Sequence, residues 1–107
     1  LFNEAGLIVM TAFISPFTKD RQGAKEVIGD DRFVEVFVDA PLEVCEERDL
    51  KGLYAKARSG EIPDFTGISS PYEPPESPEL HLNTAFLSVE ECLDSIMDHL
   101  RKGNTID

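Results

Sequence analysis

Four of the ten basic residues of this sequence gather within eleven consecutive positions, at Arg48, Lys51, Lys56 and Arg58, with only Asp49 opposing them. Clustered guanidinium and ammonium groups bind anions, and phosphate is the usual one. Residues 59–100 contain nine acids and no Lys or Arg, so the cluster is isolated. Two interpretations follow: the cluster faces a phosphate-bearing ligand, or it is the solvated face of an ordinary amphipathic helix.

Two further positions are candidates for ligand contact. Ser15 and Pro16 follow the apolar stretch 7–14, and ligands of open α/β sheets bind just past the carboxyl ends of parallel strands. Ser-Pro is also a common strand-ending turn. Phe65 precedes Thr66-Gly67 in a Pro-rich segment. An aromatic side chain on a loop either anchors the loop or offers a ring face on which a base can stack.

The elements that must position these residues alternate between strand and helix. The continuous apolar stretch 7–14 predicts a strand buried on both faces. Residues 17–28 predict a helix that ends at Gly29, with Ala24, Val27 and Ile28 on its inner side. Residues 33–38 predict a second strand, and Pro41 opens a further helix that runs to Arg48. This order predicts a parallel sheet with right-handed crossovers.

The second half of the chain is organised around a long loop. Residues 53–58 predict a short helix, and residues 60–78 hold five of the seven prolines, so this loop is either functional or disordered. Residues 79–83 alternate as a strand does. Ser88 and Glu91 form a capping box for a helix that carries apolar side chains at helical spacing as far as Gly103.

Composition bounds the class of protein. The 107 residues carry a net charge of −11 with 41% hydrophobic residues, which fits one small domain and excludes a disordered acidic tail. The acidity argues against a general nucleic-acid or membrane-surface binder. The two cysteines, 47 positions apart, indicate neither a disulfide framework nor a zinc ribbon, so we expect a cytoplasmic protein. Residues 1–5 resemble the end of a helix closed by Gly6, which predicts that the chain is the later part of a larger domain.

Seven short strings, in order along the chain, resemble adenylylsulfate kinase (APS kinase). Each string is weak alone, but the ordered set is specific. They lie at residues 11–16 (TAFISP), 35–42 (EVFVDAPL), 45–49 (CEERD), 51–58 (KGLYAKAR), 65–68 (FTGI), 72–73 (YE) and 78–80 (PEL).

The resemblance implies an α/β fold of the P-loop kinase type, with a parallel sheet flanked by helices. It also implies transfer of the ATP γ-phosphate, with Mg²⁺, to the 3′-hydroxyl of adenosine 5′-phosphosulfate (APS), giving PAPS for sulfate assimilation. The family's phosphate loop, Gly-x-x-x-x-Gly-Lys-Ser/Thr, is absent from this sequence, as is its Asp-Gly-Asp-Asn-x-x-Arg segment. The chain therefore resembles the C-terminal part of one APS kinase domain, and the Mg²⁺ ligands are expected in an N-terminal part.

The resemblance assigns roles to individual residues. A lid-like segment is expected at about residues 48–75. Ser15 is expected to contact substrate and, in descriptions of the family, to carry a phosphoserine intermediate, whereas chemistry favours direct in-line transfer. The ATP-binding residues implied are Arg48, Leu87 and Cys92. The substrate-binding residues implied are Ile14, Ser15, Pro16, Lys51, Asp64, Phe65 and Thr66.

Local explanations compete at several of these positions. Arg48 also suits a helix C-terminus, where the macrodipole favours a cation. Leu87 and Cys92 are equally well explained as core residues. His81 and His99 have no evident acid partner in the sequence and receive no role.

Two functional hypotheses follow from the resemblance. The first is an active APS kinase that uses ATP and Mg²⁺ and forms a homodimer, with fusion to or association with ATP sulfurylase left open, although these 107 residues alone are expected to be inactive. The second is a kinase-like regulatory or interaction domain that binds APS or PAPS without turnover.

Overall fold

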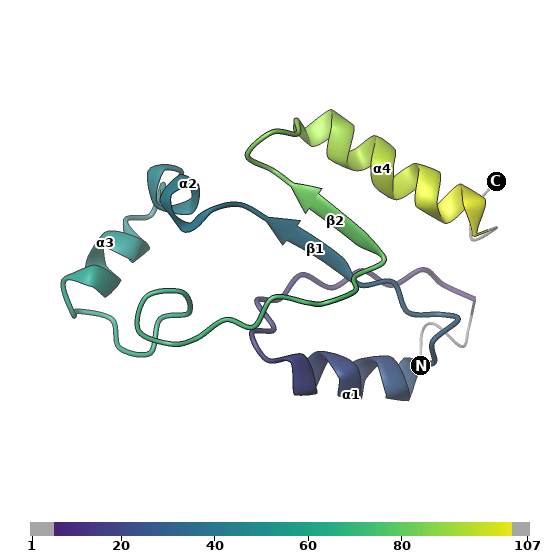
Figure 1. Cartoon of the computed structure of the whole chain (residues 1–107), viewed down its shortest axis with the longest axis horizontal. Coiled ribbons are helices and arrows are strands. Elements are labelled where there is room, and N and C mark those ends of the chain that lie inside the picture. Colours follow the sequence, from purple (N-terminus) through teal and green to yellow (C-terminus); the bar gives the residue numbers. More distant parts are fainter. Residues whose placement is uncertain (1–5, 104–107) are drawn as a thin grey trace.

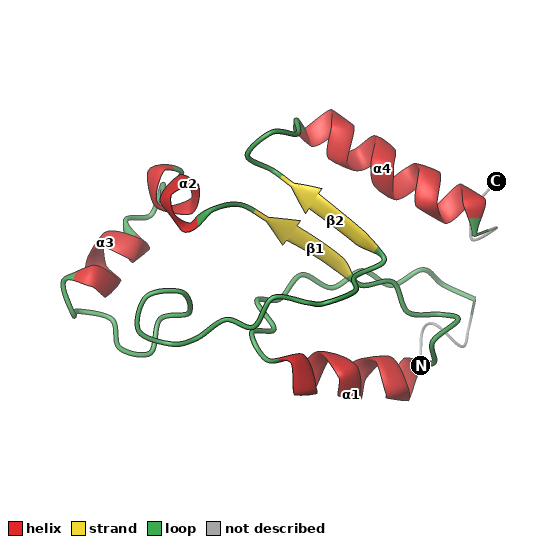
Figure 2. Ribbon diagram, viewed as in Figure 1, coloured by secondary structure: helices red, strands yellow, loops and turns green. Residues whose placement is uncertain are grey.

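A computed structural model describes residues 6–103. It contains two strands and four helices, arranged so that α1 and α4 lie on either side of the strands while α2 and α3 lie beyond one end of them (Figures 1 and 2). The helix predicted at residues 1–5 falls outside the described residues. In chain order the elements are α1 (Thr18–Ile28), β1 (Val36–Asp39), α2 (Leu42–Glu47), α3 (Leu53–Arg58), β2 (Leu80–Asn83) and α4 (Val89–Lys102).

The sheet consists of β1 and β2, which pair in parallel with Val36 opposite Leu80 and Asp39 opposite Asn83. The parallel arrangement and the strand at 79–83 are thereby confirmed. The strand predicted at 33–38 begins three residues later than expected and ends at Asp39. On one sheet face, the rings of Phe37 and His81 stack with their centroids 4.8 Å apart. This cross-strand pair helps to fix the register.

The helices of the second half form where local signals predict them. At the start of α4, the Ser88 hydroxyl accepts from the Glu91 backbone N–H at 3.1 Å, and the Glu91 carboxylate accepts from the Ser88 N–H at 3.0 Å. This reciprocal pair satisfies two N–H groups that the helix cannot satisfy itself. The short helix predicted at 53–58 is α3, with the predicted bounds.

The strand predicted at residues 7–14 is not present. Residues 7–14 are extended backbone without assigned strand structure, and their side chains are exposed, including Met10 at 89% and Phe13 at 80%. Within residues 6–103, no backbone hydrogen bond joins this stretch to another segment. A strand needs a hydrogen-bonded neighbour as well as apolar side chains, and the described residues provide none here.

Helix α1 forms as predicted and ends at Gly29, whose φ of 102° closes it. Its inner face is not the predicted one, since Ala24, Val27 and Ile28 are all exposed. The half-buried face carries Thr18, Arg21 and Lys25 instead. Arg21 pairs with Glu35 and Lys25 with Glu79, and both acids directly precede a strand. Ion pairs therefore orient this helix in place of apolar packing.

The described fold is open. Its Cα radius of gyration is 16.0 Å, against about 13 Å for a compact domain of this length. Among the described residues, Ala57 and Leu82 are the only buried hydrophobic residues, at 6% and 3% exposure. Within the same range, no helix has the length and apolar character required to cross a membrane.

Candidate functional site

An open, largely apolar pocket lies where the strands end, with a volume of about 460 Å³. That volume is within the usual range for a small-molecule site. The pocket brings together all three predicted ATP-binding residues, which come from the end of α2, the turn after β2 and the first turns of α4. It is lined by Val38, Arg48, Leu82, Thr84, Leu87, Ser88, Val89, Cys92 and Ile96.

Arg48 is held in this pocket by Thr84. Its guanidinium donates to the Thr84 hydroxyl at 3.1 Å and to the Thr84 carbonyl at 2.8 Å. The Thr84 hydroxyl and backbone N–H in turn donate to the Asp39 carbonyl at the end of β1, at 3.1 and 2.8 Å. The end of the sheet therefore orients the Arg48 guanidinium. Within residues 6–103, Arg48 forms no ion pair with a carboxylate.

Leu87 and Cys92 form the apolar side of the pocket. The turn after β2 is closed by the Leu87 N–H, which donates to the Asn83 carbonyl at 3.0 Å. Ser88 then begins α4, and Cys92 lies one turn further along, half-buried. The pocket therefore presents an apolar wall beside a guanidinium group, a combination that suits a flat, electron-rich ring.

The basic cluster is divided by the structure. Arg58 pairs with Glu46, and this hydrogen bond lowers the pKa of the Glu46 carboxyl below its usual 4.5. Lys51 and Lys56 are exposed and form no ion pair with any residue between 6 and 103. Lys51, the predicted substrate contact, is therefore available to an anion, whereas Arg58 already has an acidic partner.

Asp49 positions Lys51 and α3. Its two carboxylate oxygens accept from the backbone N–H groups of Leu53 and Tyr54 at 3.0 and 2.8 Å, which caps the short helix. Gly52 precedes the helix at φ 69°, a left-handed conformation that glycine adopts without a steric cost. Lys51 thus projects from a tight connection between α2 and α3.

Asp64, Phe65 and Thr66 lie in one tight turn. The Phe65 carbonyl accepts from three successive N–H groups, those of residues 68–70, and Thr66 forms an isolated bridge with Ser70. Asp64 has a φ of 53°. The half-buried Phe65 ring meets the Tyr54 ring edge-on at 5.0 Å. Its position supports the anchor interpretation and leaves part of the ring accessible to a base.

Ile14, Ser15 and Pro16 form the turn that leads into α1. Ile14 is 67% exposed, and Ser15 has a φ of 43°, which is uncommon for a residue with a side chain. The Pro16 carbonyl accepts from the Glu73 N–H at 2.7 Å. This contact joins the turn to the end of the long loop. None of the seven predicted substrate-binding residues lines the pocket that contains Arg48.

The structure adds residues that sequence reasoning did not select. Thr84 orients Arg48, while Arg21 and Glu73 connect the Ser15 turn to the long loop. The contacts of Thr84 with Arg48 and of Glu73 with Arg21 span 36 and 52 positions of sequence, so no local pattern indicates them. His81 also has an acid partner after all, since its Nε2 lies 2.8 Å from Asp39 Oδ2. No three His, Cys, Asp or Glu side chains gather as a metal site in residues 6–103.

The fold and the pocket together define a class. Parallel strands connected by helices, with a pocket at their carboxyl ends, are typical of α/β proteins, the P-loop kinases among them. The family model for adenylylsulphate kinase matches residues 1–83. The chain belongs to the adenylylsulphate kinase family.

Relatives and solved structures agree with this assignment. The chain is 57% identical over 106 residues to the adenylyl-sulfate kinase of Acaryochloris marina, covering 99% of this chain and 52% of that protein. It is 59% identical over 104 residues to the enzyme of Aeromonas salmonicida, covering 97% and 53%. The structure of the Mycobacterium tuberculosis APS kinase CysC in complex with AMPPNP and APS is similar, with a TM-score of 0.78 and 48% identity over 83% of this chain and 52% of that one. The chain spans about half the length of the curated relatives it matches.

Proposed function

We propose that this chain forms the part of an adenylylsulfate kinase that holds the ATP base and one side of APS. The single observation that carries the proposal is the convergence of Arg48, Leu87 and Cys92 on one pocket at the carboxyl end of a parallel sheet. Family membership supports the reaction, which is phosphorylation of the APS 3′-hydroxyl by ATP to give PAPS. The M. tuberculosis relative solved with AMPPNP and APS supports the two substrates.

In this proposal the pocket binds adenine. The Arg48 guanidinium covers one face of the base while Leu87 and Cys92 contact it from the apolar wall. A cation over an aromatic face contributes about 0.5–2 kcal/mol, and burial of the ring adds an apolar term. These residues therefore supply affinity and orientation for ATP rather than chemistry.

The APS side of the proposed site uses the two turns described above. Phe65 stacks on the APS adenine, Asp64 and Thr66 contribute backbone contacts, and Lys51 neutralises phosphate or sulfate charge. Ile14, Ser15 and Pro16 contact the nucleotide from the other turn. A charged hydrogen bond from Lys51 contributes about 1.5–3 kcal/mol, and base stacking on Phe65 about 1–3 kcal/mol.

The transfer itself is proposed to be direct. The APS 3′-oxygen forms a bond to the γ-phosphorus of ATP while the bond to the β,γ-bridging oxygen breaks, so ADP leaves and the hydroxyl proton is released. Ser15 then acts as a contact; a phosphoserine at this position is the alternative that mass spectrometry distinguishes. Mg²⁺ neutralises charge in such transfers, but the described residues offer no cluster for it, so no step here is assigned to the metal.

The assembly proposed for this family member is a homodimer in the cytoplasm, fused to or associated with ATP sulfurylase. Intact mass of the complete gene product that carries this sequence tests the fusion. A mass near 11.9 kDa contradicts it, and a mass above that of one kinase domain supports it. Sedimentation equilibrium of the same material tests the homodimer, which a monomer mass would contradict.

The function is tested on the complete gene product by a coupled assay that measures ADP formation in the presence of APS, together with detection of PAPS. ADP release that requires APS, ATP and Mg²⁺ together supports the kinase. Binding of APS without turnover contradicts it and favours the regulatory domain that binds APS or PAPS. Labelled ATP followed by digestion and mass spectrometry shows whether Ser15 carries phosphate during turnover.

A further inference from the structure

One side chain, Arg21, joins the Ser15 turn to the end of the loop that carries the Phe65 turn. Its guanidinium donates to the Ser15 carbonyl and to the Glu73 carbonyl, each at 2.5 Å. It also donates to the Thr18 hydroxyl at 3.1 Å. One planar group thus connects the Ser15 turn, the start of α1 and the end of the loop that carries Phe65.

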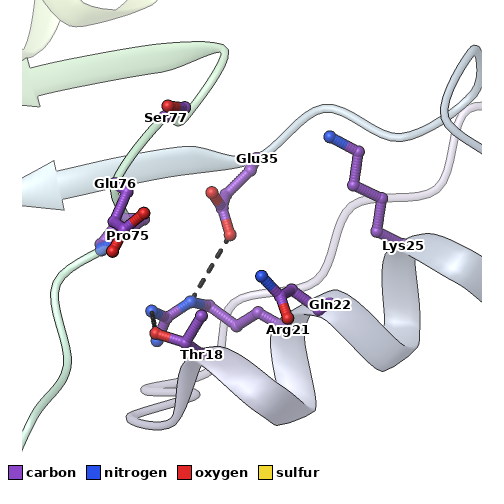
Figure 3. Close-up of a pocket in the computed structure, with 8 residues that line it drawn as sticks. All are labelled: Thr18, Arg21, Gln22, Lys25, Glu35, Pro75, Glu76 and Ser77. Atoms are coloured by element: carbon purple, nitrogen blue, oxygen red, sulfur yellow. Dashed lines mark hydrogen bonds and ion pairs between the residues drawn. The ribbon is translucent and has the colours of Figure 1, made fainter.

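Further contacts reinforce this connection from both sides. The Glu73 N–H donates to the Pro16 carbonyl, and the Glu73 carboxylate accepts from the Thr18 N–H at 2.8 Å. The Arg21 side chain is only 10% exposed, and its Nε lies 3.5 Å from a carboxylate oxygen of Glu35. In Figure 3, Arg21 extends from α1 toward Glu35, with Thr18 beside it and the loop residues Pro75 and Glu76 facing it. The ring of Tyr72 lies under the guanidinium at 5.8 Å.

We propose that Arg21 is a positioning residue for APS: it holds the Ser15 turn and the 60–78 loop in the relative geometry that lets both contact the same substrate. The inference rests on the proposed function. Ser15 has a positive φ, a conformation that persists only when its surroundings hold it. Arg21 is the side chain that holds the Ser15 carbonyl. The fixed fork of a guanidinium serves several acceptors in one plane, which a lysine ammonium does not.

The effect of Arg21 is expected to be selective for APS. Arg21 is absent from the lining of the Arg48 pocket, so loss of its guanidinium leaves the proposed ATP-base site unchanged. Loosening the two turns separates the contacts that APS needs at the same time. The KM for APS therefore rises while the KM for ATP does not.

The test is steady-state kinetics of the complete gene product with Arg21→Ala, varying APS and ATP separately. We expect the KM for APS to rise about tenfold, the effect of about one charged hydrogen bond lost between the loosened turns and the substrate, with the KM for ATP within about twofold. Arg21→Lys is expected to behave like Arg21→Ala, whereas added guanidinium ion is expected to recover part of the APS affinity of Arg21→Ala. Lys25→Ala is the matched control, because Lys25 lies one turn along the same helix and pairs with Glu79.

The outcomes separate this inference from the proposed function. A wild-type protein without APS-dependent ADP release overturns the proposed function and, with it, this inference. An active wild type in which Arg21→Ala raises both KM values equally, or neither, overturns only the role of Arg21, as does an equal effect of Lys25→Ala. If Arg21→Ala does not fold, Arg21→Lys decides: it keeps a cation opposite Glu35 but lacks the guanidinium fork that serves both carbonyls, and a KM for APS raised about threefold or more supports the role whereas an unchanged KM overturns it.

Discussion

Removal of the Arg48 guanidinium tests the proposed ATP-base pocket most directly. Arg48→Met keeps an unbranched apolar stem of similar length but deletes the two hydrogen bonds to Thr84. The donor is charged, so each bond would contribute about 1.5–3 kcal/mol if it were buried, but both bonds are exposed and solvent screening removes most of that contribution. We therefore expect the variant to fold, with a free energy of unfolding lowered by less than about 2 kcal/mol.

The effect on nucleotide affinity follows from the same geometry. A guanidinium placed over adenine contributes about 0.5–2 kcal/mol, so its loss raises the dissociation constant for an ATP analogue about two- to thirtyfold. The affinity for APS should change by less than about twofold, because Arg48 contacts neither of the turns that contain Ser15 and Phe65.

Fluorescence titration with a labelled ATP analogue, carried out on the complete gene product, measures this effect. Arg58→Met is the matched control, since it removes a cation ten residues away whose partner is Glu46 and which does not line the pocket. Equal analogue affinity in wild type and Arg48→Met would refute the assignment of the base to this pocket. An equal loss in Arg58→Met would instead show a general electrostatic effect.

Three further predictions concern stability, ionisation and substrate binding. Leu82 is 3% exposed, so Leu82→Ala should lower the free energy of unfolding, measured in urea, by about 2–5 kcal/mol. Val89 is 86% exposed, so Val89→Ala should change that free energy by less than about 0.5 kcal/mol. Similar losses in the two variants would contradict the assignment of Leu82 to the core. Arg58→Met should raise the pKa of Glu46 back toward 4.5, as read by NMR titration. Because the folded pKa is the lower one, the pair stabilises the fold above pH 4.5 and stops doing so as pH falls through the lowered value; an unchanged pKa would show that Arg58 is not the cause. Phe65→Leu should raise the KM for APS about five- to 150-fold through loss of stacking, and an unchanged KM would assign Phe65 to anchoring alone.

Local signals predicted the second half of the fold well. The capping box of Ser88 and Glu91 and the alternation at 79–83 depend on neighbours within a few residues, and both elements form where expected. The first half was predicted less well because its elements depend on distant partners. The apolar stretch 7–14 has no hydrogen-bonded neighbour among residues 6–103. The inner face of α1 is determined by ion pairs with Glu35 and Glu79, and the sequence of the helix alone does not indicate these distant partners.

The candidate site shows the same division. Arg48 and Leu87 were predicted as ATP-binding residues from the resemblance to a family, and in the structure both line one pocket. Thr84 and Glu73 were missed because they contact Arg48 and Arg21 across 36 and 52 positions of sequence. Only a folded chain reveals hydrogen bonds over such separations.

The parallel pairing of β1 with β2 has a consequence for how the chain folds. Val36 and Leu80 are register partners 44 positions apart, so closing that loop opposes folding by about 3 kcal/mol before any contact is gained. At synthesis rates of about 5–20 residues per second, roughly 2–9 s pass between the synthesis of Val36 and that of Leu80. Throughout that interval β1 lacks the strand with which it pairs, and its backbone N–H and C=O groups are open to any neighbouring nascent chain, which makes the order of synthesis, and not only the final fold, a determinant of yield.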